Sequence, residues 1–257
     1  MKNIEEKYLQ HEEKIVVAVG DTDFNEHIKP SAIMGYCQDI ATKHADSLGF
    51  GYADLFKLNL AWIMIRMSFK VFKNPKINET LLIKTFCEKP KTLDVNRSYY
   101  IYNADGEIVV SASSKWCVID IDTQKVSRLA TLFEKYNDSL YIPTEPFDDA
   151  NPKIQAAPDI THAAELPAFM VQVTDLDRNF HMNNARYGDI ILNACGVETL
   201  KENILTRVDL NFISQLFVGD KYEVYKSKKD NFIFVEAKKS GSDTVIFRAR
   251  TEWQSCD

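Results

Sequence analysis

The same short pattern occurs twice in this chain, half a chain apart. Residues 21–28 read DTDFNEHI and residues 175–182 read DLDRNFHM, so both copies have the form D-x-D-x-N-x-H-[IM] and lie 154 positions apart. Each copy follows an apolar run and precedes a helical pattern. A repeat at this distance predicts two copies of one fold unit, each presenting the same polar turn. We call residues 21–28 the first corner and residues 175–182 the second corner.

The elements expected around each corner follow one order. In the first half, apolar residues at three- and four-residue steps predict a helix over 31–48. Alternating patterns and turn signals predict strands at 14–19, 62–72, 81–87, 97–102 and 108–121, with a hairpin at 103–106. In the second half, we expect a helix at 184–194 and strands at 169–173, 206–212, 222–226, 232–238 and 244–253. Each half therefore reads as α+β, one helix wrapped by a curled antiparallel sheet.

A stretch punctuated by prolines separates the two halves. Residues 136–166 are acidic and poor in strand patterns, which predicts a linker that runs over the surface. The expected organisation is an N-terminal unit over 1–135, this linker, and a C-terminal unit over 167–257. Two such units can pair edge to edge into one longer sheet that wraps both helices.

Charge and cysteine usage exclude several classes of protein. A net charge of −6 and a pI of about 5.5 argue against a nucleic-acid binder, which normally carries a basic face. The five cysteines are scattered, odd in number and without a C-x-x-C pair, which favours a reducing compartment. Residues 1–7 lack the apolar core of a signal peptide, and no apolar run approaches the ~20 residues of a membrane span. We therefore expect a cytoplasmic protein.

Three segments resemble one known family. Residues 175–187 resemble, almost position for position, the D-L-D-x-N-x-H-x-N-N-x-x-Y segment of the acyl-acyl-carrier-protein thioesterases of plants and bacteria. Residues 62–67 resemble that family's W-x-x-x-R-M strand, and residues 113–116 with 123–129 resemble its S-K-W strand and the loop after it. The resemblance implies a tandem double hotdog fold. It also implies a hydrolase that ends fatty acid synthesis by releasing free fatty acids from the phosphopantetheine arm of acyl carrier protein, without a cofactor.

The second corner carries residue types that suit thioester hydrolysis. Asp177 can act as general base or as a carboxylate nucleophile, and Asn179 can orient a water or hold the substrate carbonyl. His181 can act near neutrality, because an unperturbed imidazole has a pKa of about 6.5. In an extended segment these alternate side chains would share one face. The backbone N–H groups of Asn183, Asn184 and the next residue could then supply oxyanion donors.

Other interpretations of the second corner remain open. Asp and Asn are also favoured at helix N-caps and in turns, so the pattern can be purely structural. Asp175, Asp177 and His181 could ligate a metal, but we expect none because no second cluster of ligands is evident. Relatives usually carry a glutamate where this chain has Gln215, which can orient water but cannot take a proton. Leu216 stands beside it where plant members carry a cysteine, which disfavours a Cys–His mechanism.

The first corner departs from this pattern immediately after its histidine. Lys29 and Pro30 replace the two asparagines, and proline has no N–H to donate. In the resembled family the N-terminal unit holds the acyl chain. Residues expected to line such a tunnel are Ile33, Met34, Cys37, Trp62 and Met64, with plain core packing as the alternative.

The sequence leaves the exact activity and assembly open. An acyl-CoA thioesterase shares the pantetheine arm of the substrate, and a non-catalytic acyl-binding protein would keep the tunnel without turnover. The expected partner is acyl carrier protein, with no nucleic acid and no membrane span. Two fused units can act alone or pair again as a homodimer.

Overall fold

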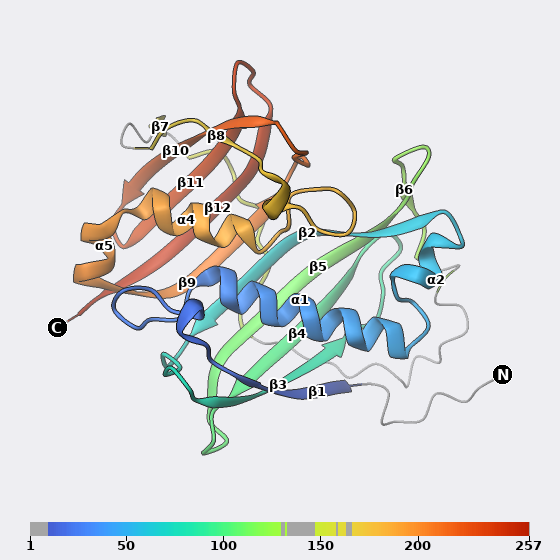
Figure 1. Ribbon diagram of the computed structural model, residues 1–257, viewed down its shortest axis with the longest axis horizontal. Helices are drawn as coiled ribbons and strands as arrows, with labels where there is room; N and C mark the ends of the chain where they lie inside the picture. The colour runs from blue at the N-terminus through green and yellow to red at the C-terminus, as the bar shows by residue number, and fades with distance from the viewer. Residues whose placement is uncertain (1–9, 130–131, 133–146, 158, 163–165, 257) are drawn as a thin grey trace.

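The computed structural model describes residues 10–129, 132, 147–157, 159–162 and 166–256. Within these residues one 12-stranded sheet, antiparallel at every pairing, curls around two helices that lie on the same face (Figure 1). The sheet is continuous along the order β1-β3-β4-β5-β2-β9-β12-β11-β10-β7, while β6 pairs with β5 and β8 with β10. This is the expected α+β double hotdog arrangement.

The elements of the two halves correspond in order. The first half comprises β1 (Gln10–Val16), a 3-10 turn (Val19–Asp21), α1 (Pro30–Ser47), α2 (Tyr52–Phe56), β2 (Leu60–Val71), β3 (Thr80–Cys87), β4 (Val95–Tyr102), β5 (Ile108–Asp120) and β6 (Val126–Ser127). The second half comprises β7 (Thr161–His162), β8 (Phe169–Met170), a 3-10 turn (Val173–Asp175), α4 (Arg186–Cys195), α5 (Val197–Glu202), β9 (Asn203–Phe212), β10 (Lys221–Lys229), β11 (Phe232–Lys239) and β12 (Val245–Ser255). The short helices α2 and α5 were not expected from the sequence.

The halves join where β2 pairs with β9, from Arg66 opposite Asn211 to Lys70 opposite Arg207. This pairing confirms that two units share one longer sheet. Side chains alternate across it: Met67 faces the helices and is buried, whereas Ser68 faces the opposite side. The junction therefore contributes to the core on one face and to a polar layer on the other.

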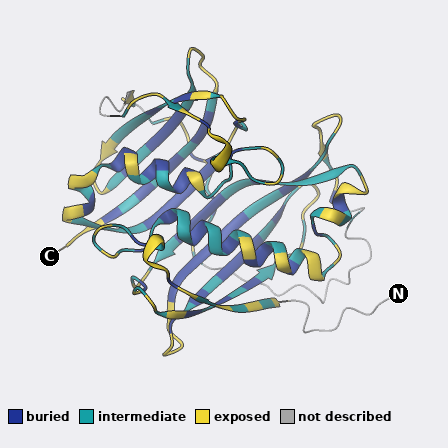
Figure 2. Cartoon of the chain, in the orientation of Figure 1, coloured by how far each residue is buried: buried dark blue, intermediate teal, exposed yellow. Residues whose placement is uncertain are grey.

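Helix α1 is held by its apolar stripe. Pro30 occupies its first turn, where a missing N–H costs nothing, and the helix ends at Ser47 before Gly49, whose φ is 76°. The residues that α1 buries against the sheet are Ile33, Met34, Cys37, Ile40 and Ala41 (Figure 2). Each large aliphatic side chain buried in this way contributes roughly 1.5–3 kcal/mol.

Helix α4 is shorter and begins later than expected. Residues 183–185 form a turn instead, because the Asn183 side chain accepts the backbone N–H of Ala185 at 2.8 Å. Gly188 lets α4 approach the start of α1: a Cβ there would lie 2.4 Å from the backbone nitrogen of Ser31. The side chain of Ser31 also donates a hydrogen bond to Asp189. The N-terminal ends of the two helices are thus fixed against each other.

The expected surface linker is in part a buried strap. Asn151 is 6% exposed, and its side chain and backbone donate to Ser113 and Ser68 on the sheet face opposite the helices. Ile154 is 8% exposed, and its N–H donates to the side chain of Asn211. A proline-rich composition did not reveal these polar anchors. Residues 136–146, 158 and 163–165 of the expected linker lie outside the described residues.

Candidate active site

The backbones of the two corners are nearly identical. Asp23 and Asp177 each donate their N–H to the carbonyl oxygen of the histidine four residues later, at 2.8 Å in both corners. The Oδ1 atom of each aspartate accepts the N–H of the residue two positions later, again at 2.8 Å. The second corner is therefore a tight turn, with Phe180 at φ 61°, and not the extended segment expected from the sequence. The spacing that the two corners share is first of all turn chemistry.

In the first corner the polar side chains bind other parts of the fold. The Asn25 amide donates to the carbonyl oxygen of Leu200 in α5, at 2.7 Å. The N–H of Ile28 donates to the side chain of Asn74, in the loop after β2, at 2.9 Å. His27 is not among the residues that line the large cavity described next. The first corner thus uses its motif to hold the two halves together.

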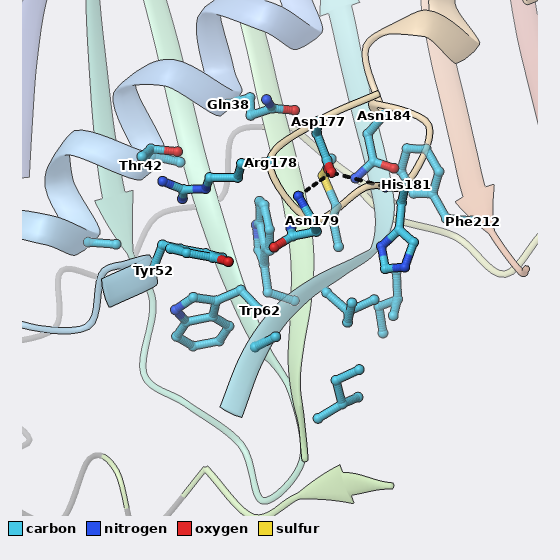
Figure 3. A pocket seen from close by; sticks show the side chains of 18 of the residues that line it. Gln38, Thr42, Tyr52, Trp62, Asp177, Arg178, Asn179, His181, Asn184 and Phe212 are labelled. Atoms are coloured by element: carbon cyan, nitrogen blue, oxygen red, sulfur yellow. Dashed lines mark hydrogen bonds between the residues drawn. The ribbon is translucent and has the colours of Figure 1, made fainter. Parts of the chain in front are cut away.

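In the second corner Asp177, Asn179 and His181 all line a cavity of about 880 Å³ (Figure 3). Its walls come from both halves: the C-terminal part of α1, α2, the start of β2, the second corner and residues 212–217. Within the described residues, the side-chain amide of Asn179 makes no hydrogen bond to protein. Tight turn geometry therefore brings the three expected catalytic side chains to one cavity by a different route from the one predicted.

The residues expected to hold an acyl chain divide into two groups. Trp62 and Met64 line the cavity, whereas Ile33, Met34 and Cys37 pack in the core between α1 and the sheet. The Trp62 ring is fixed by a hydrogen bond from its indole N–H to the carbonyl oxygen of Phe50, at 2.9 Å. The periodic apolar residues indicated which face of α1 is buried. They could not show which of the buried residues pack in the core and which line the cavity.

One backbone N–H distinguishes the two corners. The N–H of Asn183 donates to the carbonyl oxygen of Asp175, and that of Ala185 to the Asn183 side chain, both at 2.8 Å. Of the three N–H groups expected as oxyanion donors, only that of Asn184 makes no hydrogen bond within the described residues. The expectation is therefore wrong for Asn183 and Ala185. Pro30 stands at the position that matches Asn184 in the first corner, and it has no N–H.

The surroundings of His181 favour its neutral form. Burial lowers the pKa of its imidazole from the ordinary value of 6.5, and the negative charge of Asp177 opposes this shift without reversing it. The rings of Phe217 and His181 pack in a T-shaped arrangement, with centroids 4.8 Å apart. Because the pKa is lowered, His181 carries a free nitrogen lone pair at pH 7.

Gln215 reaches the cavity through the loop that follows β9. The carbonyl oxygen of Leu216 accepts the N–H of Met182 at 2.8 Å, which seats this loop against the second corner. In the first corner the matching N–H, that of Ile28, is accepted by the Asn74 side chain instead. The loop thus presents Gln215 to the cavity, and Leu216 is buried beside it.

Sequence reasoning missed two residues at the rim of the cavity. Arg178 extends from the second corner and lies over the ring of Tyr52 in α2, with its guanidinium carbon 4.4 Å from the ring centroid (Figure 3). Both residues line the cavity. The only sequence signal was that Arg178 falls between two motif residues, at a position where the first corner has Phe24.

Cys87 lines the cavity with a thiol whose pKa is raised by burial, whereas Cys195 does not line it. Cys195 is buried in the core, and burial raises the pKa of its thiol to about 12. No group of three or more His, Cys, Asp or Glu residues in the described part of the chain is placed to hold a metal ion. None of the described helices is both long and apolar enough to cross a membrane.

Similar proteins share both the sequence and the architecture. The chain is 24% identical over 219 residues to oleoyl-acyl carrier protein thioesterase 2, chloroplastic, of Arabidopsis thaliana, covering 79% of this chain and 59% of that protein. It is 25% identical over 225 residues to the oleoyl-acyl carrier protein thioesterase of Coriandrum sativum, covering 82% of this chain and 60% of that protein. The chain thus spans about 60% of the length of these plant relatives.

Solved structures show the same fold. An acyl-ACP thioesterase from Bacteroides thetaiotaomicron matches with a TM-score of 0.83 and 23% identity, covering 98% of this chain and 100% of that one. The 12:0-ACP thioesterase from Umbellularia californica matches with a TM-score of 0.84 and 18% identity, covering 96% of this chain and 98% of that one.

Two family models complete the comparison. The model of the acyl-ACP thioesterase N-terminal domain matches residues 8–136, and the model of the C-terminal domain matches residues 159–255. The first model alone covers half of the chain. The chain therefore belongs to the acyl-ACP thioesterase family.

Proposed function

We propose that this protein hydrolyses the thioester of acyl-acyl carrier protein and releases a free fatty acid. The observation that carries this proposal is the cavity of about 880 Å³, which is lined both by Asp177, Asn179 and His181 and by Trp62 and Met64. The polar side chains suit a thioester, and the apolar side chains suit an alkyl chain. The C-terminal unit would then supply the chemistry, and the N-terminal unit would hold the acyl chain.

In the proposed reaction a water molecule attacks the thioester carbon. Neutral His181 takes a proton from the water as the new C–O bond forms. Asp177 balances the resulting imidazolium, since its charge already favours the protonated form of His181. Gln215 orients the water through its side-chain amide.

The developing oxyanion needs donors that are not already committed. The backbone N–H of Asn184 and the side-chain amide of Asn179 fit this role, because neither donates to another described residue. When the tetrahedral intermediate collapses, the C–S bond breaks and His181 returns its proton to the leaving sulfur. The products are a carboxylic acid and the free thiol of the carrier.

The test is turnover of a pool of acyl-acyl carrier proteins of mixed chain length, with the released acids identified by mass spectrometry. In addition, Asp177→Asn keeps an oxygen that can accept the turn N–H groups but removes the charge beside His181. We expect at least about a hundredfold fall in kcat with carrier binding retained. The matched control is Asp23→Asn in the first corner, which should keep wild-type turnover.

The outcomes separate the neighbouring functions. Acid release no faster than in a buffer blank, with acyl carrier still bound, would identify a non-catalytic acyl-binding protein. Faster turnover of acyl-CoA than of acyl carrier protein would identify an acyl-CoA thioesterase. Cytoplasmic location and pairing into a homodimer stay predictions, which cell fractionation and sedimentation can check.

A further inference from the structure

Each corner rests on the short helix of the opposite half. In the first corner the side chain of Asn25 binds the carbonyl oxygen of Leu200 in α5, at 2.7 Å. In the second corner the side chain of Arg178 lies on the ring of Tyr52 in α2, at 4.4 Å. Contact with the short helix of the opposite half is thus made by Asn25 in the first corner. In the second corner it is made by Arg178, the residue before the matching Asn179.

This exchange changes what the second asparagine can do. Asn179 matches Asn25 in the motif, yet its side chain lies at the cavity and donates to no described residue. Its backbone N–H is held by the carboxylate of Asp177, at 2.8 Å. Arg178, the residue next to it, contacts Tyr52 of the N-terminal half from this part of the turn (Figure 3).

Arg178 is exposed and Tyr52 is half-buried, so their contact lies at the surface end of the cavity lining. Within the described residues Arg178 forms no ion pair with a carboxylate, so its guanidinium is not drawn to a competing acidic partner. Stacking of a guanidinium on a tyrosine face is favourable, and it is directional enough to hold a turn in place. Phe24, at the matching position of the first corner, is 58% exposed and is not needed there because Asn25 supplies the anchor.

We infer that Arg178 and Tyr52 form a positioning pair: they take over the anchoring role that Asn25 performs in the first corner and so free the Asn179 amide to hold the substrate carbonyl. This inference rests on the proposed hydrolase function. Neither Arg178 nor Tyr52 needs to touch the reacting atoms. Their effect reaches the reaction through the placement of Asn179.

The experiment measures kcat and KM for acyl-acyl carrier protein in single and double variants. Arg178→Ala and Tyr52→Ala should each lower kcat about three- to tenfold with KM little changed, and the double variant should fall no further than either single one. Tyr52→Phe keeps the ring and should retain most of kcat, whereas Arg178→Lys keeps the charge but loses the planar guanidinium and should retain only part of it. Phe24→Ala is the matched control in the first corner and should behave as wild type.

The decisive measurement is the effect of Arg178→Ala on kcat in a protein that already carries Asn179→Ala. If Arg178 acts through Asn179, adding Arg178→Ala to Asn179→Ala changes kcat by less than about twofold, because the group being positioned is already absent. If the losses of kcat in Arg178→Ala and Asn179→Ala multiplied in the double variant, the inference would be overturned. An Arg178→Ala variant with wild-type kcat would also overturn it. Equal melting temperatures of wild type and Arg178→Ala exclude a general loss of stability. Wild-type protein without any turnover would overturn the proposed function itself, and the positioning role with it.

Discussion

The two corners differ less in their backbones than in what their side chains contact. Both close the same turn through the same aspartate, with matching distances of 2.8 Å. In the first corner the motif asparagine binds α5 and a proline follows, so its polar groups serve the fold. In the second corner the asparagine lines a cavity, and the N–H of Asn184 donates to no residue in the described part of the chain. A duplicated turn can therefore stay intact in both copies while only one keeps groups free for chemistry.

The helices that follow the corners differ in a related way. Helix α1 has 18 residues and α4 has 10. The later turns of α1, together with α2, form part of the cavity wall, whereas α4 borders the cavity through Tyr187 in its first turn, whose ring also packs against Phe212 and Phe247. The longer helix thus borders more of the cavity, and the walls of the cavity come from both halves.

The largest expected difference between the corners is at their histidines. His181→Ala should lower kcat by about 10²- to 10⁴-fold, because it removes the proposed base. His27→Ala should stay within about twofold of wild type, since His27 does not line the cavity. Release of fatty acid from acyl-acyl carrier protein measures both. Equal losses in the two variants would mean that both corners are active.

Replacing Asn184 by proline tests directly whether its backbone N–H is an oxyanion donor. Asn184→Pro gives the second corner the residue that the first corner has at Pro30. The turn of the first corner accommodates a proline at this position. Removing one oxyanion donor should lower kcat about 10²- to 10³-fold. Asn184→Ala is the control, because it removes the side chain and keeps the N–H. If both variants lose the same activity, the side chain and not the backbone is responsible.

The smallest expected effect is a shift in pH dependence. The pKa of His181 is lowered below 6.5, so the protonated and inactive form accumulates only as pH falls through that lower value. The acid limb of kcat/KM should therefore have its midpoint below pH 6.5, with activity falling about tenfold per pH unit beneath it. Phe217→Ala uncovers the ring and should move the limb to higher pH. A wild-type midpoint above 6.5 would contradict a desolvated base.

Much of the fold could be predicted from the sequence, because helices and hairpins depend on the local pattern of apolar and turn-forming residues. The apolar stripe of α1 placed that helix within one residue at each end, and the hairpin at residues 103–106 was confirmed by a tight turn with Gly106 at φ 80°. Helix α4 was placed less well, because the Asn183 side chain accepts a hydrogen bond from the N–H of Ala185 and a turn replaces the expected start of the helix. Helices α2 and α5 were missed, since 5 and 6 residues are too few to show a period.

The sequence alone indicated a duplicated chain in which each half has a polar corner of the same residue pattern. It also indicated that the second corner carries the residues suited to thioester chemistry. These properties follow from spacing, which local hydrogen bonds fix. Only the tertiary structure decided which groups are free to react. Whether Asn25 or Asn179 is committed depends on helices about 175 and 125 positions away in the chain, and whether an apolar residue packs in the core or borders the cavity depends on how both halves close around it.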